Sequence, residues 1–270
     1  MGTADSTPDT AQAGAAGLRA RPAVATILSG AHRLLVAPLR MFNASLRALT
    51  AFFHHFQYKV EGFLRPSAEW FDHEIDVHWQ WVAKQRSMFL ERGVLNTLAM
   101  APGAEILELC CGDGFNAHRF YAGRGSRVLA VDYNAQALRH ARRYHHRANV
   151  EYRQCDIRSE LPQGSFDNIV WDSAIHHFSA PETNAILASA RARLRPAGVL
   201  SGYTIIEPHA EYAYTRMRFA SPEELAKLLE QVFAHVAVLE TPDALRRNLY
   251  FFASDTRAAL PFAQGVNRLP

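Results

Sequence analysis

The sequence predicts an α/β fold built around a mostly parallel, doubly wound sheet with helices on both faces. Short apolar runs typical of strands alternate with segments of helical period from residue 105 to residue 254. The chain of 270 residues is 49% hydrophobic and 20% charged, a composition that allows one main domain with a full core. Strands that alternate with helices are joined by right-handed crossovers and therefore pair in parallel.

The predicted elements follow one another in a regular order. Strands are expected at residues 105–110, 127–132, 150–155, 166–172, 199–206, 236–240 and 249–254. Helices are expected at residues 115–122, 135–146, 181–194 and 221–232, and the last two begin with the capping boxes Ser179 to Glu182 and Ser221 to Glu224. The last two strands form a closing pair joined through ETPDALRR.

The N-terminal region has a different character. Residues 1–22 are rich in Ala, Gly, Thr, Ser and Pro and are predicted to be a disordered tail. From residue 23 to residue 56, apolar side chains recur at three- and four-residue intervals and predict a helix, which Pro38 should kink or split. The stripe consists of Leu28, Leu35, Leu39, Phe42, Leu46, Leu49, Phe53 and Phe56.

This N-terminal helix is predicted to be basic as well as amphipathic. Arg33, Arg40 and Arg47 repeat every seven residues beside the stripe, and no acid occurs between Asp9 and Glu61. Its uncharged runs are too short to span a bilayer. Three interpretations stay open: a helix that packs on the rest of the protein, a helix that docks on a membrane surface or a partner through residues 23–60, and a cleaved targeting sequence.

Charge and cysteine content exclude several classes of protein. The net charge is +3, but residues 61–270 carry 23 basic and 24 acidic residues, so no basic face for nucleic acid is expected. Cys110, Cys111 and Cys155 are too few and too close for a disulfide framework, which favours a reducing, cytoplasmic compartment. Helical spacing brings Glu69 near His73 and Asp72 near Asp76, but this pattern is more typical of a polar helix face, and we expect no metal site.

The candidate ligand site lies where the predicted strands end, because ligands of such sheets bind beyond the carboxyl ends of the strands. The first strand ends in CCGDG, whose glycines Gly112 and Gly114 allow a sharp turn and close approach to a ligand. The ends of the next three strands contribute Asp132, then Cys155 and Asp156, then Asp172, His176 and His177. GDGFNA also fits the dinucleotide pattern GxGxxG/A, but the closing strand pair disfavours an NAD-type oxidoreductase.

These motifs resemble those of the class I S-adenosylmethionine-dependent methyltransferases, in particular the small-molecule, quinone-biosynthesis type. ELCCGDG, VLAVDYN, QCDI, FDNIVWDSAIHHF and LRPAGVL are similar to five successive family motifs, and the resemblance covers roughly Leu95 to Ser254. It implies a Rossmann-like seven-stranded doubly wound sheet with an N-terminal helical extension. The expected domains are a tail at 1–22, a helical region at 23–94, the methyltransferase domain at 95–255 and a C-terminal tail at 256–270.

The resemblance also implies the cofactor, S-adenosyl-L-methionine, and its binding residues. Glu108 and Gly112 are expected beside the methionine moiety, Asp132 at the ribose hydroxyls and Asp156 at the adenine amino group. The full expected cofactor set is Glu108, Cys110, Gly112, Gly114, Asp132, Tyr133, Asp156, Ile157 and Asp172. Cys110 stands where many family members have glycine, and the cysteines are expected to do no chemistry.

The expected reaction is an in-line displacement at the sulfonium methyl group. His176 and His177 are candidates for a general base, although both equally suit the wall of the cofactor pocket. The acceptor pocket is expected between Trp70 to Trp81 and Glu207 to Phe219, whose aromatic residues, with Arg216 and Arg218, favour a small aromatic or amphiphilic acceptor. A non-catalytic cofactor-binding subunit of a membrane-associated complex shares every one of these motifs and stays an alternative.

Overall fold

The computed structural model describes residues 22–64, 72–84, 87–206, 215–242 and 247–268. The chain forms two compact units, Met1–Phe53 and His54–Pro270. The predicted tail at 1–22 lies outside the described residues except for Pro22, where the first helix begins. No helix in the described part of the chain is long and apolar enough to cross a membrane.

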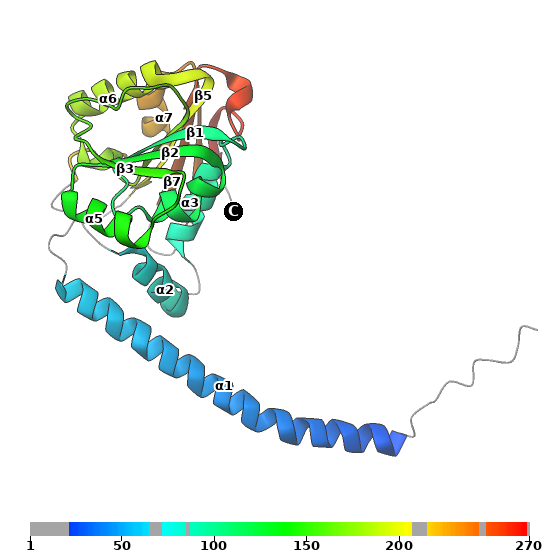
Figure 1. The fold of residues 1–270 in the computed structure, drawn as a ribbon. Coiled ribbons are helices and arrows are strands. Elements are labelled where there is room, and N and C mark those ends of the chain that lie inside the picture. Colours follow the sequence, from blue (N-terminus) through cyan, green and yellow to red (C-terminus); the bar gives the residue numbers. More distant parts are fainter. Residues whose placement is uncertain (1–21, 65–71, 85–86, 207–214, 243–246, 269–270) are drawn as a thin grey trace, which may run out of the picture. The chain divides into compact units, whose positions relative to one another are not determined.

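The N-terminal helix is longer than the sequence pattern indicated. Helix α1 spans Pro22–Leu64 with Pro38 inside it (Figure 1), so of the two expected effects of this proline, a kink or a split, the split does not occur. Proline removes one backbone donor, and the loss is local. The flanking leucine, arginine, methionine and alanine residues are good helix formers and carry the helix past this point.

One sheet of eight strands organises the second unit, in the order β3-β2-β1-β4-β5-β7-β6-β8 (Figure 1). The strands are β1 (Ala104–Leu109), β2 (Gly125–Asp132), β3 (Val150–Gln154), β4 (Phe166–Asp172), β5 (Leu194–Ile206), β6 (His235–Pro242), β7 (Arg247–Ser254) and β8 (Gly265–Arg268). Strands β3, β2, β1, β4 and β5 pair in parallel, whereas β7 is antiparallel to both β5 and β6. The predicted parallel sheet and its closing strand pair are confirmed.

The eighth strand corrects the expected count of seven. Strand β8 pairs in parallel with β6 and lies within residues 256–270, which we expected to be a tail. It is only four residues long and contains a single apolar side chain, Val266, so the sequence shows no alternation of apolar and polar residues that would predict a strand here. Its edge position explains this composition, because an edge strand needs little apolar surface.

The helices begin close to the predicted positions. They are α2 (His73–Lys84), α3 (Met88–Thr97), α4 (Phe115–Arg119), α5 (Ala135–Tyr144), α6 (Ala180–Arg193) and α7 (Pro222–Glu230), with short 3₁₀ turns at Tyr121–Gly123, Ile175–His177 and Arg257–Ala259. At the start of α6 the Ser179 N–H donates to Glu182 Oε2 at 2.8 Å, as a capping box requires. At α7 only half of the expected box forms, because Glu224 Oε2 accepts from Ala220 N rather than from Ser221 N.

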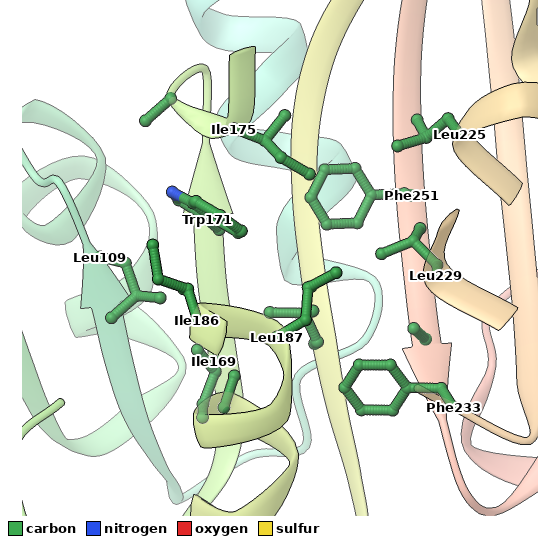
Figure 2. Close-up of a cluster of buried hydrophobic side chains, with 14 of the residues drawn as sticks. Leu109, Ile169, Trp171, Ile175, Ile186, Leu187, Leu225, Leu229, Phe233 and Phe251 are labelled. Carbon is green, nitrogen blue, oxygen red and sulfur yellow. The ribbon is translucent and has the colours of Figure 1, made fainter. Parts of the chain in front are cut away.

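Both faces of the sheet are buried because alternate residues of each strand point to opposite sides. Leu107 and Leu109 of β1 face the layer formed by α6 and α7, and Figure 2 shows Ile186, Leu187, Leu225 and Leu229 of these helices pointing toward the strands. Ile106 of the same strand faces the layer that contains Tyr121 and Leu138. Helix α3 covers this second face further along, against Tyr203 and Tyr250.

Helix α3 belongs with the sheet rather than with the N-terminal helix. Glu91 accepts hydrogen bonds at 2.8 Å from both Thr241 and Tyr250, on β6 and β7. Helix α3 belongs to the compact unit His54–Pro270, and the domain boundary that we expected between residues 94 and 95 lies within the bounds of this helix and stays a prediction. This packing depends on contacts about 150 residues apart in sequence, which local patterns do not report.

Candidate functional site

A cavity of about 490 Å³ lies at the carboxyl ends of β1, β2 and β4. Between β1 and β4 the order of the strands in the sheet reverses, and ligands of such sheets bind at this point. All but one of the residues that we expected at the site border it. These are Glu108, Cys110, Gly112, Asp132, Tyr133, Asp156, Ile157, Asp172, His176 and His177. The strand ends thus bring together side chains from four separate segments, as the predicted parallel sheet requires.

The turn after β1 is built from left-handed backbone. Cys110 has φ 57° and Gly112 has φ 55°, and a Cβ atom added to Gly112 would meet nothing within 4 Å. Gly112 therefore exposes its backbone to the open cavity. Asp132 supports the turn from β2, because its Oδ2 accepts a hydrogen bond from Gly112 N at 2.9 Å while its Oδ1 accepts one from Asn134 N at 2.8 Å.

Gly114 is the expected site residue that the cavity does not include. It has φ 77° and precedes α4, and an added Cβ would come within 2.6 Å of the Tyr152 ring. The Tyr152 hydroxyl lies 3.3 Å from the Gly114 carbonyl, to which it donates. Glycine is needed here for close packing against Tyr152 and for the left-handed conformation, rather than for room beside a ligand.

The cysteines of the turn are poor nucleophiles. Burial raises the pKa of both Cys110 and Cys111 well above the ordinary thiol value, and the nearby carboxylates raise it further. Both thiols are therefore protonated at neutral pH, and the thiolate is the reactive form. This agrees with the expectation that the double cysteine does no chemistry.

Asp172 at the end of β4 is held by a buried group of donors. It accepts from Arg92 Nε at 3.0 Å, from Asn96 Nδ2 at 3.2 Å and from Asn116 Nδ2 at 2.9 Å, and Arg92 Nη2 makes a further short contact. The side chains of Arg92 and Asp172 are 5% and 4% exposed. Asp172 borders the cavity with its charge already balanced by Arg92.

Glu108 presents a buried carboxyl group to the same cavity. Among the described residues its Oε2 atom has no hydrogen-bond partner. Burial raises the pKa of Glu108 well above its usual range, and the neighbouring Asp172, Asp113 and Asp132 raise it further. A buried polar atom without a partner, facing a cavity, is the feature that a cationic or donating ligand group would satisfy.

The far rim of the cavity is more open. Asp156 is bound by Arg158 through contacts of 2.9 Å and 3.1 Å from Arg158 Nε to its two carboxylate oxygens. These hydrogen bonds lower the pKa of Asp156 and keep it anionic at neutral pH. Tyr133 is half exposed beside it. This rim therefore combines an aromatic ring with an acceptor group.

The two histidines after β4 differ strongly in environment. Burial and the neighbouring His177 lower the pKa of His176 to about 3, and its Nδ1 lies 3.3 Å from Thr204 Oγ1. His177 is exposed, and the two ring centroids are 4.2 Å apart. An imidazole with so low a pKa is a weak base, so the geometry of His176 suits the wall of the cavity.

The structure describes only part of the two predicted acceptor segments. Glu69, Trp70 and residues 207–214 lie outside the described residues, and Arg216 is paired with Glu182 at 2.9 Å. Among the described residues of the first segment, His73 borders the cavity. Sequence reasoning missed Met88, Arg92, Asn116, Tyr203 and Ile205, all of which border the cavity. The available indication for Arg92 was an arginine that shares a helix face with the apolar Met88 and Phe89.

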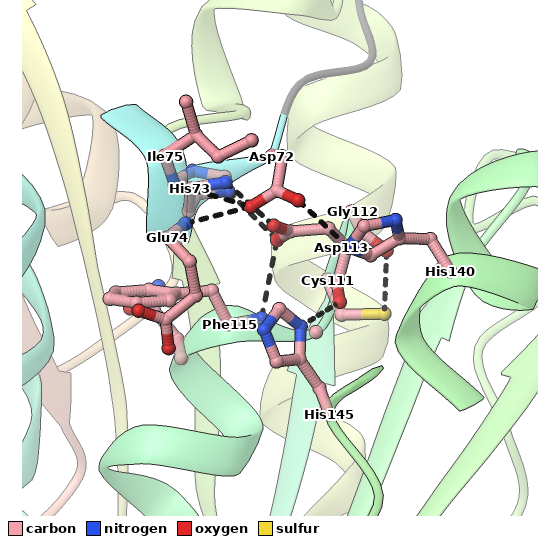
Figure 3. A network of polar contacts seen from close by, with 12 residues as sticks. Asp72, His73, Glu74, Ile75, Cys111, Gly112, Asp113, Phe115, His140 and His145 are labelled. Carbon is pink, nitrogen blue, oxygen red and sulfur yellow. Dashed lines mark hydrogen bonds and ion pairs between the residues drawn. The ribbon is translucent and has the colours of Figure 1, made fainter. Parts of the chain in front are cut away.

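A polar network connects α2 to the glycine turn (Figure 3). His73 contacts Asp113 twice, because its N–H donates to Oδ2 and its Nδ1 lies 2.8 Å from Oδ1. His145 Nδ1 lies 2.5 Å from the carbonyl oxygen of Asp113. His140 Nε2 lies 3.4 Å from Asp72 Oδ2. Asp113, between the two glycines of the turn, is the centre of this network.

Comparisons with known proteins agree with this site. Residues 106–198 match the family model described as a methyltransferase domain. An uncharacterized methyltransferase of Mycobacterium tuberculosis is 30% identical over 159 residues, which cover 58% of this chain and 78% of that protein. An uncharacterized methyltransferase of Synechocystis is 30% identical over 113 residues, which cover 40% of this chain and 50% of that protein.

Solved structures share the fold. The complex of DhpI with SAH has a TM-score of 0.51 and 21% identity, covering 67% of this chain and 88% of that one. The S-adenosylmethionine-dependent methyltransferase SibL has a TM-score of 0.52 and 15% identity, covering 68% of this chain and 59% of that one. With the mycobacterial relative matched over most of its length, and with the expected strand ends gathered around one cavity, the chain belongs to the class I S-adenosylmethionine-dependent methyltransferases.

Proposed function

We propose that this methyltransferase acts on a small acceptor of aromatic or amphiphilic character. The observation that carries the proposal is the lining of the cavity by Met88 of α3 and by Tyr203 and Ile205 of β5. Strand β5 lies two strands away from β1, which leads into the glycine turn. Arg92 on the same side is already neutralised by Asp172, so this wall does not demand an anionic acceptor. A mostly apolar wall with few polar groups is typical of sites for small molecules.

The residues around the glycine turn fit the cofactor. The cavity of about 490 Å³ lies within the usual range for sites of this kind of ligand. We assign Glu108 to the methionine amino group because its buried Oε2 has no hydrogen-bond partner among the described residues. Gly112 exposes backbone to the methionine part, Asp132 accepts from the ribose hydroxyls, and Asp156 accepts from the adenine amino group. The roles of these residues follow the family resemblance.

The protein's own part in the reaction is mainly alignment. Bound S-adenosylmethionine supplies an activated methyl group, and the cavity walls hold the acceptor in line with it while they exclude water. We assign His176 to the wall, because its pKa of about 3 makes it a weak base. His177 borders the cavity and is exposed, and it is the better placed of the two to take a proton from an acceptor.

The acceptor is best identified by screening fractionated lysate metabolites with radiolabelled cofactor. The full chain should label a small organic compound, and the Asp132→Ala variant should label it less. Labelling of protein or nucleic acid alone would contradict the proposed acceptor class. With the acceptor in hand, His177→Ala should lower turnover and remove a limb of the pH-rate profile, whereas His176→Ala should mainly change acceptor affinity.

We further propose that α1 holds the enzyme reversibly to an anionic membrane surface. In residues 36–53 of this helix Leu39, Phe42 and Phe53 are 65%, 62% and 58% exposed. Arg40 and Arg47 are exposed on the same helix, and no acid lies between Asp9 and Glu61. An apolar face next to basic side chains is complementary to anionic lipid, and each basic residue near such a surface adds about 1 kcal/mol. A membrane would also concentrate an amphiphilic acceptor.

A further inference from the structure

The Asp113, His140 and His145 side chains form a compact cluster on the outer side of the glycine turn (Figure 3). One carboxylate oxygen of Asp113 and one ring nitrogen of each histidine lie within 4.8 Å of one another. Asp113 and His145 are buried, and His140 is half-buried. Asp113 comes from the turn after β1, His140 from the second half of α5, and His145 from the position that directly follows this helix.

We infer that Asp113, His140 and His145 form a binding site for one divalent transition-metal ion of the zinc type. Two imidazoles and a carboxylate are a donor set that zinc accepts readily. Zinc binds such nitrogen and oxygen atoms at about 2.0 to 2.2 Å. Atoms that already lie within 4.8 Å of one another need only small side-chain rotations to meet a common ion.

Neighbouring groups orient these ligands. The Asp113 carbonyl oxygen can only accept a hydrogen bond, so His145 Nδ1, 2.5 Å away, carries a proton, and the neutral ring keeps its lone pair on Nε2. The carboxylate of Asp113 is positioned by the backbone N–H and the ring Nδ1 of His73, each at 2.8 Å. Outer contacts of this kind fix the orientation of metal-binding histidines and carboxylates.

The charges around the cluster also suit a cation. The Asp113 carboxylate accepts backbone hydrogen bonds from His73 at 2.8 Å and from Phe115 at 3.2 Å, and both contacts favour its ionised form. Asp72 Oδ2 lies 3.4 Å from His140 Nε2 and brings a second carboxylate to the group. A metal ion binds imidazole in its neutral form, and the charges of two carboxylates then balance those of a divalent ion.

The position of the cluster indicates a structural role for the metal. Asp113 lies between Gly112 and Gly114, so an ion bound to it would join the cofactor turn to α5. Asp113 and His73 border the cavity, whereas the histidines of the cluster lie outside its lining in the described part of the chain. The metal would therefore brace the turn without entering the methyl-transfer chemistry.

The test uses the untagged full chain, freed of metal by a chelator and dialysis. Titration calorimetry with Zn²⁺ should show one site per chain, and Co²⁺ should produce the visible absorption of a tetrahedral centre. His140→Ala and His145→Gln should each weaken Zn²⁺ binding by at least about tenfold. Zn²⁺ should also raise the melting temperature of the wild-type chain and leave that of the two variants unchanged.

His146→Ala is the matched control, because His146 is exposed and adjacent to His145. It should bind Zn²⁺ as the wild type does. Far-ultraviolet circular dichroism establishes that each variant is folded, and His140→Gln replaces any variant that is not. Absence of Zn²⁺ and Co²⁺ binding by the folded wild-type chain, or equal losses in His146→Ala and in the cluster variants, would overturn the site. These measurements do not depend on methyl transfer.

Discussion

At the scale of single residues, the site combines strained backbone with a buried ionisable group. Cys110 occupies the left-handed region at φ 57°, where a residue with a side chain costs about 1 to 2 kcal/mol. The family preference for glycine at this position, implied by the resemblance, now has a physical reason. Glu108, two residues earlier, is buried with a raised pKa. Both features lie at the cavity wall, where strain and desolvation serve binding.

Cys110→Val should destabilise the chain by about 2 kcal/mol, because a β-branched residue fits the left-handed conformation poorly. Cys110→Gly should stay within about 1 kcal/mol of the wild type, since relief of strain offsets the loss of a small buried side chain. Urea unfolding measures both changes. Cys155→Val is the matched control at a position without positive φ, and an equal loss there would show that the backbone at Cys110 is not the cause.

The raised pKa of Glu108 predicts a pH dependence of cofactor binding. In the free protein burial and the neighbouring carboxylates favour the protonated form of Glu108, so its contribution to folding stability is lost as the pH rises through this raised pKa. A methionine amino group bound beside it favours the ionised form and lowers that pKa. Binding of S-adenosylhomocysteine should therefore release a proton and become tighter as the pH is raised toward the pKa that Glu108 has in the free protein.

Glu108→Gln tests this prediction directly. The amide cannot ionise, so affinity should fall by about 1.5 to 3 kcal/mol and its rise with pH should disappear. Calorimetry in buffers of different ionisation enthalpy measures both affinity and proton release. If the variant kept the affinity and pH slope of the wild type, Glu108 would not contact the amino group.

At the scale of elements, α3 is fixed to the end of β4 by the ion pair of Arg92 and Asp172. Arg92 and Asp172 are 80 positions apart in sequence. The Asp172 carboxylate accepts hydrogen bonds from three side chains, two on α3 and one on α4. The strands and most helices could be predicted, because their periodicity is local. This pairing could not, because nothing in the sequence around Arg92 indicates which acid it meets. The same holds for His73 and Asp113.

Arg92→Met should destabilise the chain by about 3 kcal/mol, since it leaves the buried Asp172 carboxylate without its countercharge. Combining it with Asp172→Asn should recover part of that loss. Arg119→Met is the control: Arg119 is exposed to solvent and its partner Glu74 is only partly buried, so the expected loss is below about 1 kcal/mol. Urea unfolding measures the loss of stability in each variant. Similar losses in the two single variants would show that the buried Arg92–Asp172 pair contributes no more to stability than the Arg119–Glu74 pair.

At the scale of the whole molecule, the sequence predicted the edge of the sheet at which the ligand site lies more accurately than the side chains that line this site. Asp132, Asp156 and Asp172 were found because parallel strands end at one edge, a rule that needs no side-chain detail. Gly114 does not border the cavity, and a glycine pattern in a sequence does not distinguish room for a ligand from packing against Tyr152. The eighth strand was not predicted because this short edge strand has only one apolar residue and therefore no alternating pattern.

The membrane proposal also belongs to this scale. The full chain should float with anionic vesicles in a density gradient, and less so at high salt. Arg40→Glu with Arg47→Glu should abolish flotation. The control, Arg139→Glu with Arg143→Glu on the exposed face of α5, changes the net charge equally and should still float. Equal loss in both double variants, or no flotation of the wild type, would contradict a role for α1.

The most direct test of the central claim is calorimetry of the purified full chain with S-adenosylhomocysteine and with NAD⁺. The account predicts one site per chain for S-adenosylhomocysteine and no measurable heat for NAD⁺. Asp132→Ala should weaken the first by about 1 to 3 kcal/mol, because Asp132 both accepts from the ribose and supports Gly112, whereas Glu151→Ala on the exposed part of β3 should bind normally. Binding of NAD⁺ instead, or unchanged affinity in a folded Asp132→Ala variant, would contradict the assigned cofactor site.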